Sequence, residues 1–282
     1  MPVHTGEPAP PSPFSETAAR ISELSDYLDY RVGVPDGENW RHLTGLVEAD
    51  LLAGWHAEVT GRTGDRRVAA AYMSNWLIST LVGAWLIPVL AEGRLPLAAQ
   101  RDIAVRRTEG GWFDGVAVDD DALAVLPDDP AAGHPASTVL QDRGAILDAL
   151  ADRILSLEPV IHALRAACPI GLPALRGAIA DAVANQSLLL AQVMNRDRHA
   201  VWRDADAIIE RLDERDLSLS IRPRPFSVVH KGKEEIFGVR ATCCLYYRTV
   251  DEPDRDGEGY CDTWPLRTDE SRLIRLQASI GG

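Results

Sequence analysis

The sequence predicts a mainly α-helical protein with a small antiparallel β insertion and a short C-terminal segment of strands and loops that carries most of the cysteines. Apolar residues recur at helical spacing over most of residues 14–221, change to short runs near residues 102–126, and form extended segments after residue 222. The chain has 282 residues, of which 46% are hydrophobic, enough for a large core. This composition excludes wholesale disorder and a disulfide-stapled mini-protein.

Three regions are expected along the chain. Residues 1–13 contain five prolines and no apolar signal sequence, which indicates a flexible tail and a cytoplasmic protein. Residues 14–221 are expected to form the helical body, which includes the β insertion. Residues 222–282 are expected to form the cysteine-bearing C-terminal segment.

The charge of the chain argues against nucleic-acid partners. The formal net charge is −13, so DNA, RNA and anionic lipid are repelled beyond close range. Residues 222–248 differ, because six cationic residues stand against two acidic ones, a local charge of +4. A solvated loop is the simplest interpretation of this stretch, and a docking surface for an acidic redox partner or an anionic ligand is the alternative.

The first half of the body is expected to hold three helices. Helical spacing covers residues 14–30 and 40–60, and the next run, residues 68–91, has no charged residue and is long enough to cross a bilayer. Because unpartnered polar groups are costly in lipid, we expect a central buried helix and no stable membrane span. Polar residues and Pro88 within the run argue against a span. Small and polar residues also form a row at i, i+4, i+8 and i+12 that would let another helix pack closely: Ala71, Asn75, Ser79 and Gly83.

The β insertion and the second half of the body follow the same type of pattern. Short apolar runs separated by Gly-rich and Asp-rich turns predict antiparallel strands within residues 102–126, with residues 119–121 as a solvated turn rather than a calcium loop. Helices are expected over residues 137–167 and 174–216, the latter interrupted near Asn195. Short strands are expected at residues 226–230, 236–240 and 243–248.

The cysteines carry the chemical signal. The sequence has no Gly-x-Gly-x-x-Gly, Walker, Gly-x-Ser-x-Gly or His-Glu-x-x-His motif. Cys243 and Cys244 open the run Cys-Cys-Leu-Tyr-Tyr-Arg, and after sixteen residues Cys261 opens Cys-Asp-Thr-Trp-Pro-Leu. In a reducing compartment, clustered cysteines are more often metal ligands or redox centres than disulfides. Cys168, beside a proline at a helix end, is expected to be a structural thiol.

This pattern resembles the C-terminal iron–sulfur segment of the ferric-siderophore reductases of the ferric hydroxamate reductase (FhuF-like) family. The resemblance is close over residues 225–266 and looser from about residue 40, where the body is also similar to the C-terminal part of the hydroxamate siderophore synthetases. It implies a [2Fe–2S] cluster held by thiolates, with Cys243, Cys244 and Cys261 in three of the four ligand positions. Trp264 stands in the fourth position, and tryptophan cannot ligate iron.

Three interpretations of Trp264 remain open from the sequence. Asp262 or His230, or else solvent or an outside thiol, completes the ligand set. Alternatively, the cluster is lost and the fold serves as a binding or biosynthetic module. In the third interpretation, the cysteines hold zinc or act as thiols, with one protein ligand too few for a tetrahedral zinc site.

The resemblance implies a ferric-siderophore reductase that passes one electron to a bound ferric chelate. Hard hydroxamate or catecholate oxygens hold iron(III) far better than iron(II), so reduction releases the metal. Because the sequence has no nucleotide motif, a ferredoxin or flavin carrier would be the electron donor. The alternative is a cluster-free siderophore- or natural-product-binding protein, or a non-redox biosynthetic enzyme that kept the fold.

Overall fold

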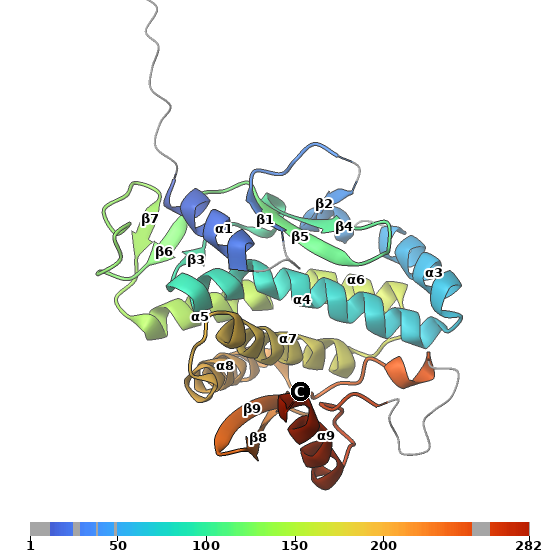
Figure 1. Cartoon of the computed structure of the whole chain (residues 1–282). Coiled ribbons are helices and arrows are strands. Elements are labelled where there is room, and N and C mark those ends of the chain that lie inside the picture. The colour runs from blue at the N-terminus through green and yellow to red at the C-terminus, as the bar shows by residue number, and fades with distance from the viewer. Residues whose placement is uncertain (1–11, 25–28, 38, 48–49, 250–259, 282) are drawn as a thin grey trace, which may run out of the picture.

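A computed structural model describes residues 12–24, 29–37, 39–47, 50–249 and 260–281, so most of the expected N-terminal tail lies outside the described residues. The fold is mainly helical with small sheets, as predicted (Figure 1). The helices are α1 (Pro13–Leu24), α2 (Leu43–Leu46), α3 (Leu51–Thr63), α4 (Arg66–Glu92), α5 (Arg143–Leu155), α6 (Glu158–Ala167), α7 (Leu172–Val193), α8 (Arg198–Leu212) and α9 (Asp269–Gly281). The strands are β1 (Asp29–Val32), β2 (Trp40–His42), β3 (Leu95–Pro96), β4 (Ile103–Arg107), β5 (Phe113–Val118), β6 (Leu123–Val125), β7 (Ser137–Val139), β8 (Arg224–His230) and β9 (Lys233–Val239).

Helix α4 forms the centre of the body. The Asp65 carboxylate caps its first turn by accepting hydrogen bonds from the backbone N–H groups of Arg67 and Val68, and Gly93, with φ of +73°, ends it. By length and composition α4 could cross a bilayer, but 78% of its most apolar 18-residue window is buried inside the protein. In Figure 1 it lies between the four-stranded sheet on one side and α7 on the other. The expected buried central helix is therefore present.

Helices α4 and α7 pack closely through small and polar residues. The Gln186 side chain donates a hydrogen bond of 2.8 Å to the Ser79 hydroxyl, and a Cβ at Gly83 would lie only 3.0 Å from Gln186 Oε1. Gly83 therefore lies at the close contact between α4 and α7, as the row of small residues in the sequence predicted. Asn75 and Ser79 also line a cavity, which the sequence did not reveal.

The predicted β insertion is part of a larger sheet. Strands β4 and β5 pair antiparallel as expected, but β1 adds to β5 in parallel and β2 adds to β4, giving the order β1-β5-β4-β2. The helices expected over residues 14–30 and 40–60 are consequently wrong at residues 29–30 and 40–42. Trp40 is fixed there by the pairing with β4 and by the Arg106 guanidinium, 5.5 Å from its ring.

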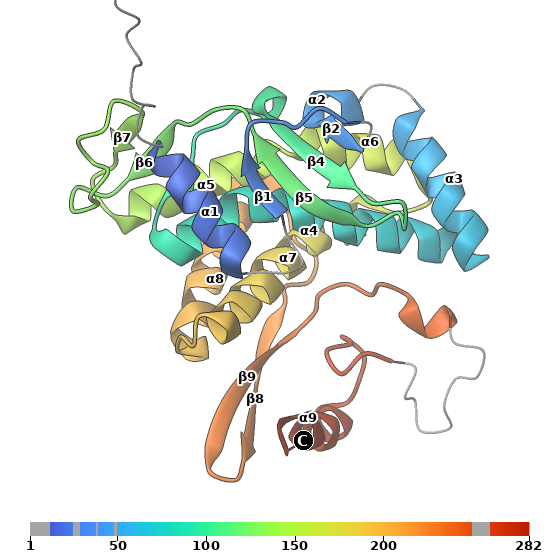
Figure 2. The ribbon, with the colours of Figure 1, turned by 45° about the horizontal axis from the view of Figure 1, so that its top comes forward.

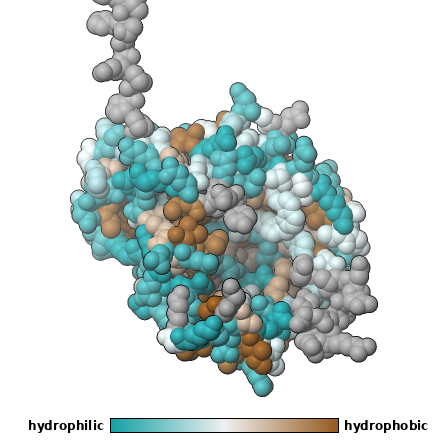
Figure 3. Space-filling model, viewed as in Figure 1, coloured by the Kyte–Doolittle hydropathy of each residue, from teal (hydrophilic) through white to brown (hydrophobic). Residues whose placement is uncertain are grey.

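The second half of the body departs from prediction in two places: the helix expected over residues 137–167 begins only at Arg143, and a turn at residues 156–157 divides it into α5 and α6. Residues 137–139 form strand β7, in a second sheet of order β3-β6-β7, rather than the start of a helix. Helices α5, α6, α7 and α8 follow, and the break between α7 and α8 contains Asn195 with φ of +50°, where an interruption was expected. On the face shown in Figure 3, hydrophilic side chains predominate and apolar ones form small groups.

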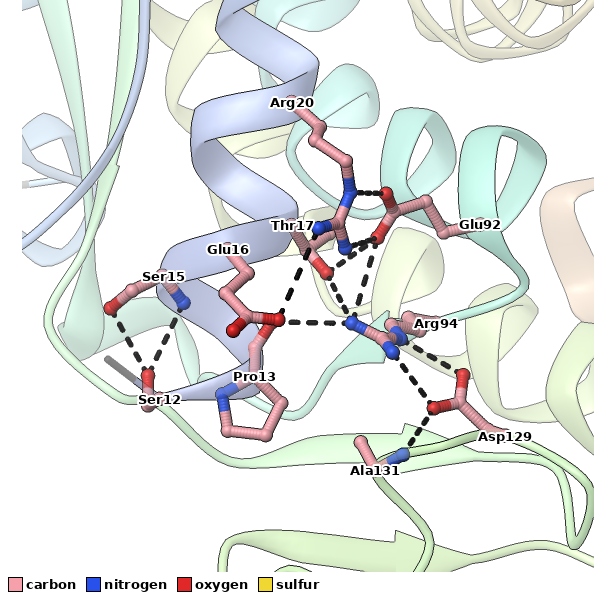
Figure 4. Close-up of polar contacts among 10 residues, drawn as sticks. All are labelled: Ser12, Pro13, Ser15, Glu16, Thr17, Arg20, Glu92, Arg94, Asp129 and Ala131. Carbon is pink, nitrogen blue, oxygen red and sulfur yellow. Dashed lines mark hydrogen bonds and ion pairs between the residues drawn. The ribbon is translucent and has the colours of Figure 1, made fainter. Parts of the chain in front are cut away.

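A buried arginine ties the start of the chain to the body (Figure 4). Arg94, just after α4, donates to both carboxylate oxygens of Asp129 at 2.8 and 2.9 Å, and to the Thr17 hydroxyl at 3.0 Å. The side chains of Arg94 and Asp129 are only 9% and 10% exposed. The pair therefore joins α1, the end of α4 and the loop after β6 through contacts largely shielded from water.

The C-terminal segment begins with a hairpin and ends with a helix. Strands β8 and β9 pair antiparallel from Arg224 opposite Val239 to His230 opposite Lys233, as predicted, around a turn at Lys231 and Gly232. Helix α9 packs on β8 (Figure 2), and residues 241–242, just after β9, lie against α7. The strand expected over residues 243–248 does not form, because Leu245 has φ of +60° and residues 246–248 form a short 3₁₀ turn.

Candidate functional site

Helix α7 anchors the segment that carries Cys243 and Cys244. The buried Asp181 carboxylate accepts hydrogen bonds from the backbone N–H groups of Ala241, at 2.6 Å, and Thr242, at 2.9 Å, and from the Thr242 hydroxyl at 2.5 Å. One turn earlier, a Cβ at Gly177 would lie 2.5 Å from the Thr242 methyl group. The absence of a side chain at Gly177 therefore permits the close approach that Asp181 fixes.

Two of the predicted site cysteines meet at Arg240. The Arg240 Nη2 atom lies 3.4 Å from Cys244 Sγ and 3.3 Å from Cys261 Sγ, so one guanidinium nitrogen contacts both sulfurs. The backbone N–H of Arg240 donates to the Thr263 carbonyl at 3.0 Å. The two cysteine-bearing parts of the chain are thus joined through both backbone and side chains.

The contact between these groups changes their protonation. The hydrogen bond with Cys244, followed by burial, raises the pKa of Cys261 well above the ordinary range of a thiol. Burial by itself would lower the pKa of Arg240, but the charge and hydrogen bond of Cys244 and the charge of Cys261 raise it overall. Arg240 therefore remains a cation, and Cys261 favours the protonated thiol.

Cys243 faces a different part of the structure. Its sulfur accepts a hydrogen bond from the Leu245 backbone N–H at 3.3 Å. It lines a separate cavity of about 430 Å³ with Ile170 and Pro173, whereas Cys244 and Cys261 line another. The structure therefore brings together two of the three predicted cysteine ligands and directs the third elsewhere.

Trp264 occupies an aromatic cluster beside Cys261. Its backbone N–H donates to the Cys261 carbonyl at 2.9 Å, so residues 261–264 form a tight turn. The indole stacks on Tyr260, with ring centroids 3.9 Å apart and an interplanar angle of 4°, and it also contacts Tyr247. The side chain at the family's fourth ligand position thus serves packing in this chain.

The two other proposed ligands have different roles. Asp262 forms an ion pair with Arg275 of α9, at 2.5 Å. His230 lies at the turn end of the β8–β9 hairpin, whereas Arg240 follows the opposite end; at about 3.3 Å per residue the separation is roughly 20 Å. The structure does not bring His230 to the cysteines, because the antiparallel register places it at the far end of the hairpin.

The described donor groups do not make up the implied cluster site. Among the residues described, no group of three histidine, cysteine or acidic side chains is placed to hold a metal ion. Two thiols converge, the third faces another cavity, and a stacked indole stands where the fourth is expected. The arrangement does not fit a [2Fe–2S] cluster, which needs four ligands around two irons.

Cys244 and Cys261 form part of the wall of a cavity of about 710 Å³, hereafter the Trp cavity. Helix α4 supplies one wall through residues at i, i+3, i+4 and i+7 spacing, and α7 supplies the facing wall with the same spacing. The α4 residues are Tyr72, Asn75, Trp76 and Ser79, and the α7 residues are Ala178, Asp181, Ala182 and Asn185. Trp112, from the β4–β5 turn, contacts Trp76 and closes one side.

Sequence reasoning missed this cavity. The sequence did contain one signal: from Tyr72 to Ser79, polar and aromatic residues repeat on one face of an otherwise apolar helix. The structure shows that this face is half-buried. The contribution of Trp112 had no such local signal, since it reaches the cavity from another element.

The basic stretch of the C-terminal segment is partly neutralised. Arg222 pairs with Asp213, Arg224 with Asp269, and Arg248 with Asp65. These ion pairs offset three of the six cationic charges in residues 222–248 and so weaken the positive field for an acidic partner. The docking surface considered from the sequence therefore loses its physical basis at these three arginines.

Comparison with known proteins adds no family assignment. No protein-family model matches the chain. No curated protein matches it either.

Proposed function

We propose that this chain is a ferric-siderophore reductase-like protein that binds a ferric siderophore or a related chelate in the Trp cavity. The observation that carries the proposal is the meeting of the cysteine motif with an aromatic cavity, since Cys244 and Cys261 share its wall with Trp76 and Trp112. Its volume of about 710 Å³ lies within the range of small-molecule sites, roughly 300–1,000 Å³. The cavity thus supplies the ligand-binding half of the function.

The side chains of the cavity suit a chelate with both apolar and polar parts. The Trp76 and Trp112 rings offer apolar faces for flat or aliphatic groups, and Trp112 is 47% exposed, within reach of an entering ligand. Asn75 and Asn185 offer amide donors and acceptors, and Arg240 offers a positive charge. Binding would orient the chelate against the wall formed by the two thiols.

Ligand binding is tested by titrating ferric hydroxamate and ferric catecholate chelates while following intrinsic tryptophan fluorescence. We expect saturable quenching, and Trp112→Ala should weaken binding about tenfold or more, because a contact-making aromatic side chain commonly contributes over 1 kcal/mol. The matched control is Leu189→Ala, an exposed apolar residue outside the cavity lining, at 52% exposure, which should bind like the unmodified chain. Equal weakening in both variants, or no saturable quenching, would reject the Trp cavity as the site.

The reduction step is the second element of the proposal. In the family that the sequence resembles, a [2Fe–2S] cluster supplies one-electron transfer. Because the described donors do not fit that cluster, no redox step through Cys243, Cys244 and Cys261 is derived for this chain. The cluster-free alternative, a siderophore- or natural-product-binding protein, is favoured by the stacking of Trp264 on Tyr260.

An anaerobic absorption spectrum with iron and sulfide counts separates these two forms of the function. A reductase with its cluster should be reddish-brown, with about two irons and two sulfides per chain. On the geometry described, we expect colourless protein, because Cys243 faces a different cavity from Cys244 and Cys261. A gain in cluster occupancy after reconstitution of Trp264→Cys would show that the missing fourth ligand is the main defect, whereas no gain would show that the position of Cys243 also prevents assembly. The matched control is Trp202→Cys, at a buried tryptophan outside the cysteine segment, which should gain none. A full cluster in the unmodified chain would contradict the cluster-free form.

A further inference from the structure

We propose that Cys244 and Cys261 are a dithiol–disulfide couple in the wall of the Trp cavity, and that their oxidation releases Arg240 from its thiol partners. This inference goes beyond chelate binding and does not depend on it. It rests on the placement of two thiols and one guanidinium, which neither a cluster nor a packing role explains.

The backbone holds the two cysteines in position for bond formation. The Arg240 N–H donates to the Thr263 carbonyl at 3.0 Å, which joins the part of the chain after β9 to the part that follows Cys261. The Asp181 carboxylate fixes Ala241 and Thr242 to α7. Because neighbouring atoms on both sides are anchored and one Arg240 nitrogen contacts both sulfurs, the two thiols are held near enough for side-chain rotations to bring them into bonding position.

The other two cysteines are poorly placed as partners. Cys243 lines the separate cavity beside Ile170, and a bond between it and the adjacent Cys244 would strain the intervening peptide. Cys168 is buried at the end of α6, where burial raises the pKa of its thiol to about 11 and suppresses the thiolate. The geometry therefore selects the Cys244–Cys261 pair.

Oxidation by a low-molecular-weight disulfide balances in two exchange steps. The Cys244 sulfur, beside the Arg240 cation, attacks one sulfur of the small disulfide, forms a mixed disulfide and releases one small thiol. The Cys261 sulfur then attacks the Cys244 sulfur and releases the second small thiol. The two protein thiols lose two electrons, the small disulfide gains them, and the two thiol protons end on the released thiols.

Oxidation changes the environment of Arg240. In the reduced chain, its guanidinium contacts both thiols, and its Nε atom is buried without a hydrogen-bond partner. A disulfide removes both S–H groups and the charge of any thiolate, so the guanidinium loses its two thiol partners and keeps its electrostatic interaction with the Asp181 carboxylate. The oxidised chain would present this cation to the Trp cavity as a site for carboxylate or another anionic ligand group.

The pairing is tested on the full-length chain by oxidation with glutathione disulfide, followed by thiol counting and intact mass. We expect two of the four thiols to be lost with no retained glutathione. Because Cys243 and Cys244 fall in one peptide, the matched variants Cys243→Ser and Cys244→Ser are required. Cys243→Ser should still form the Cys244–Cys261 bond. Cys244→Ser and Cys261→Ser should fail to form it.

Two further measurements test the role of the fold and of Arg240. In urea sufficient to unfold the chain, the equilibrium constant for forming the Cys244–Cys261 disulfide should fall about tenfold or more. The two segments that carry these cysteines are then no longer held together by the fold. Oxidation should speed modification of Arg240 by phenylglyoxal about threefold or more by peptide mapping, since lost thiol contacts expose a cation.

Several outcomes would overturn the proposal. These are a bond that requires Cys243, retention of all four thiols, an equilibrium constant equal in folded and unfolded chains, or Arg240 reactivity unchanged by oxidation. A cluster ligated by Cys244 and Cys261 in the purified protein would also overturn it. Chelate binding is measured on the reduced chain, so its failure and that of the disulfide couple are recorded separately.

Discussion

Arg94→Met is expected to lower the free energy of unfolding by about 3 kcal/mol, measured by urea denaturation near neutral pH. Methionine keeps much of the length of arginine but removes every donor, so the Asp129 carboxylate, at 10% exposure, keeps only the Ala131 backbone N–H among the contacts described. Breaking a buried pair by removing one partner typically costs about 3–5 kcal/mol, because the other charge stays buried. The Thr17 contact with α1 is lost at the same time.

The control for this variant is Arg20→Met. Arg20 pairs with Glu92 in the same group of residues, but its side chain is 47% exposed (Figure 4). Although the Glu92 side chain is 16% exposed, it keeps the Thr17 hydroxyl and Arg94 as partners when Arg20 is removed. The loss should therefore be about 1 kcal/mol, the value typical of a pair with an exposed member. If both variants lose the same amount of stability, burial is not what gives the Arg94–Asp129 pair its importance.

The same pair predicts a pH dependence. Burial raises the pKa of Asp129, but its hydrogen bonds with Arg94 and the Ala131 N–H outweigh burial and hold this pKa below the ordinary value of about 3.9. Its contribution to stability is therefore present above pH 3.9 and lost as pH falls through the lower folded value. The difference in stability between the unmodified chain and Arg94→Met should narrow below about pH 4.

The long helices and the strands of the β4–β5 and β8–β9 pairs were predictable from local sequence, whereas the short strands β1, β2 and β7 were not. Helices α4 and α7 are long runs that are apolar on most faces, so their length and composition indicate buried helices. Strand β1 has only four residues, and its partner is distant in sequence, since Asp29 lies opposite Gly115. Because such pairing depends on tertiary contacts, no window around residue 29 contains the information.

The candidate site divides in the same way. The cysteine motif identified Cys244 and Cys261 because the spacing of rare residues is itself a signal. It did not reveal that Cys243 faces another cavity, since adjacent residues in irregular backbone can point in different directions. The positions of Asp181 and Trp112 were likewise hidden, because helix α7 and a β-turn bring them to the site from distant parts of the chain.

Asp181→Asn is expected to lower the free energy of unfolding by about 1–3 kcal/mol and to loosen the cysteine site. The carboxylate accepts three hydrogen bonds, from the Ala241 N–H on one oxygen and from the Thr242 N–H and hydroxyl on the other. Asparagine presents one oxygen and an NH₂ group, so at least one donor faces another donor in a buried place. Urea denaturation measures the stability.

A second readout separates loosening of the site from general destabilisation. In the folded variant, the thiols of Cys244 and Cys261 should react severalfold faster with an aromatic disulfide reagent, because the segment that carries Arg240 is no longer fixed to α7. The matched control is Asp148→Asn, which removes contacts with Arg211 and Arg215 but is 48% exposed. Unchanged thiol reactivity in Asp181→Asn would show that this carboxylate does not position the cysteines.

The pH dependence of Asp181 has the opposite sign to that of Asp129. Burial raises the pKa of Asp181 above its ordinary value, despite the hydrogen bonds from Thr242 and Ala241. The folded chain therefore binds this proton more tightly than the unfolded chain, and stability falls as pH rises from about 3.9 through the higher folded value. Asparagine cannot titrate, so Asp181→Asn should remove this decline, whereas Arg94→Met should retain it. Denaturation curves across this pH range therefore distinguish Asp129, whose ionised form the fold stabilises, from Asp181, whose ionised form is disfavoured by burial.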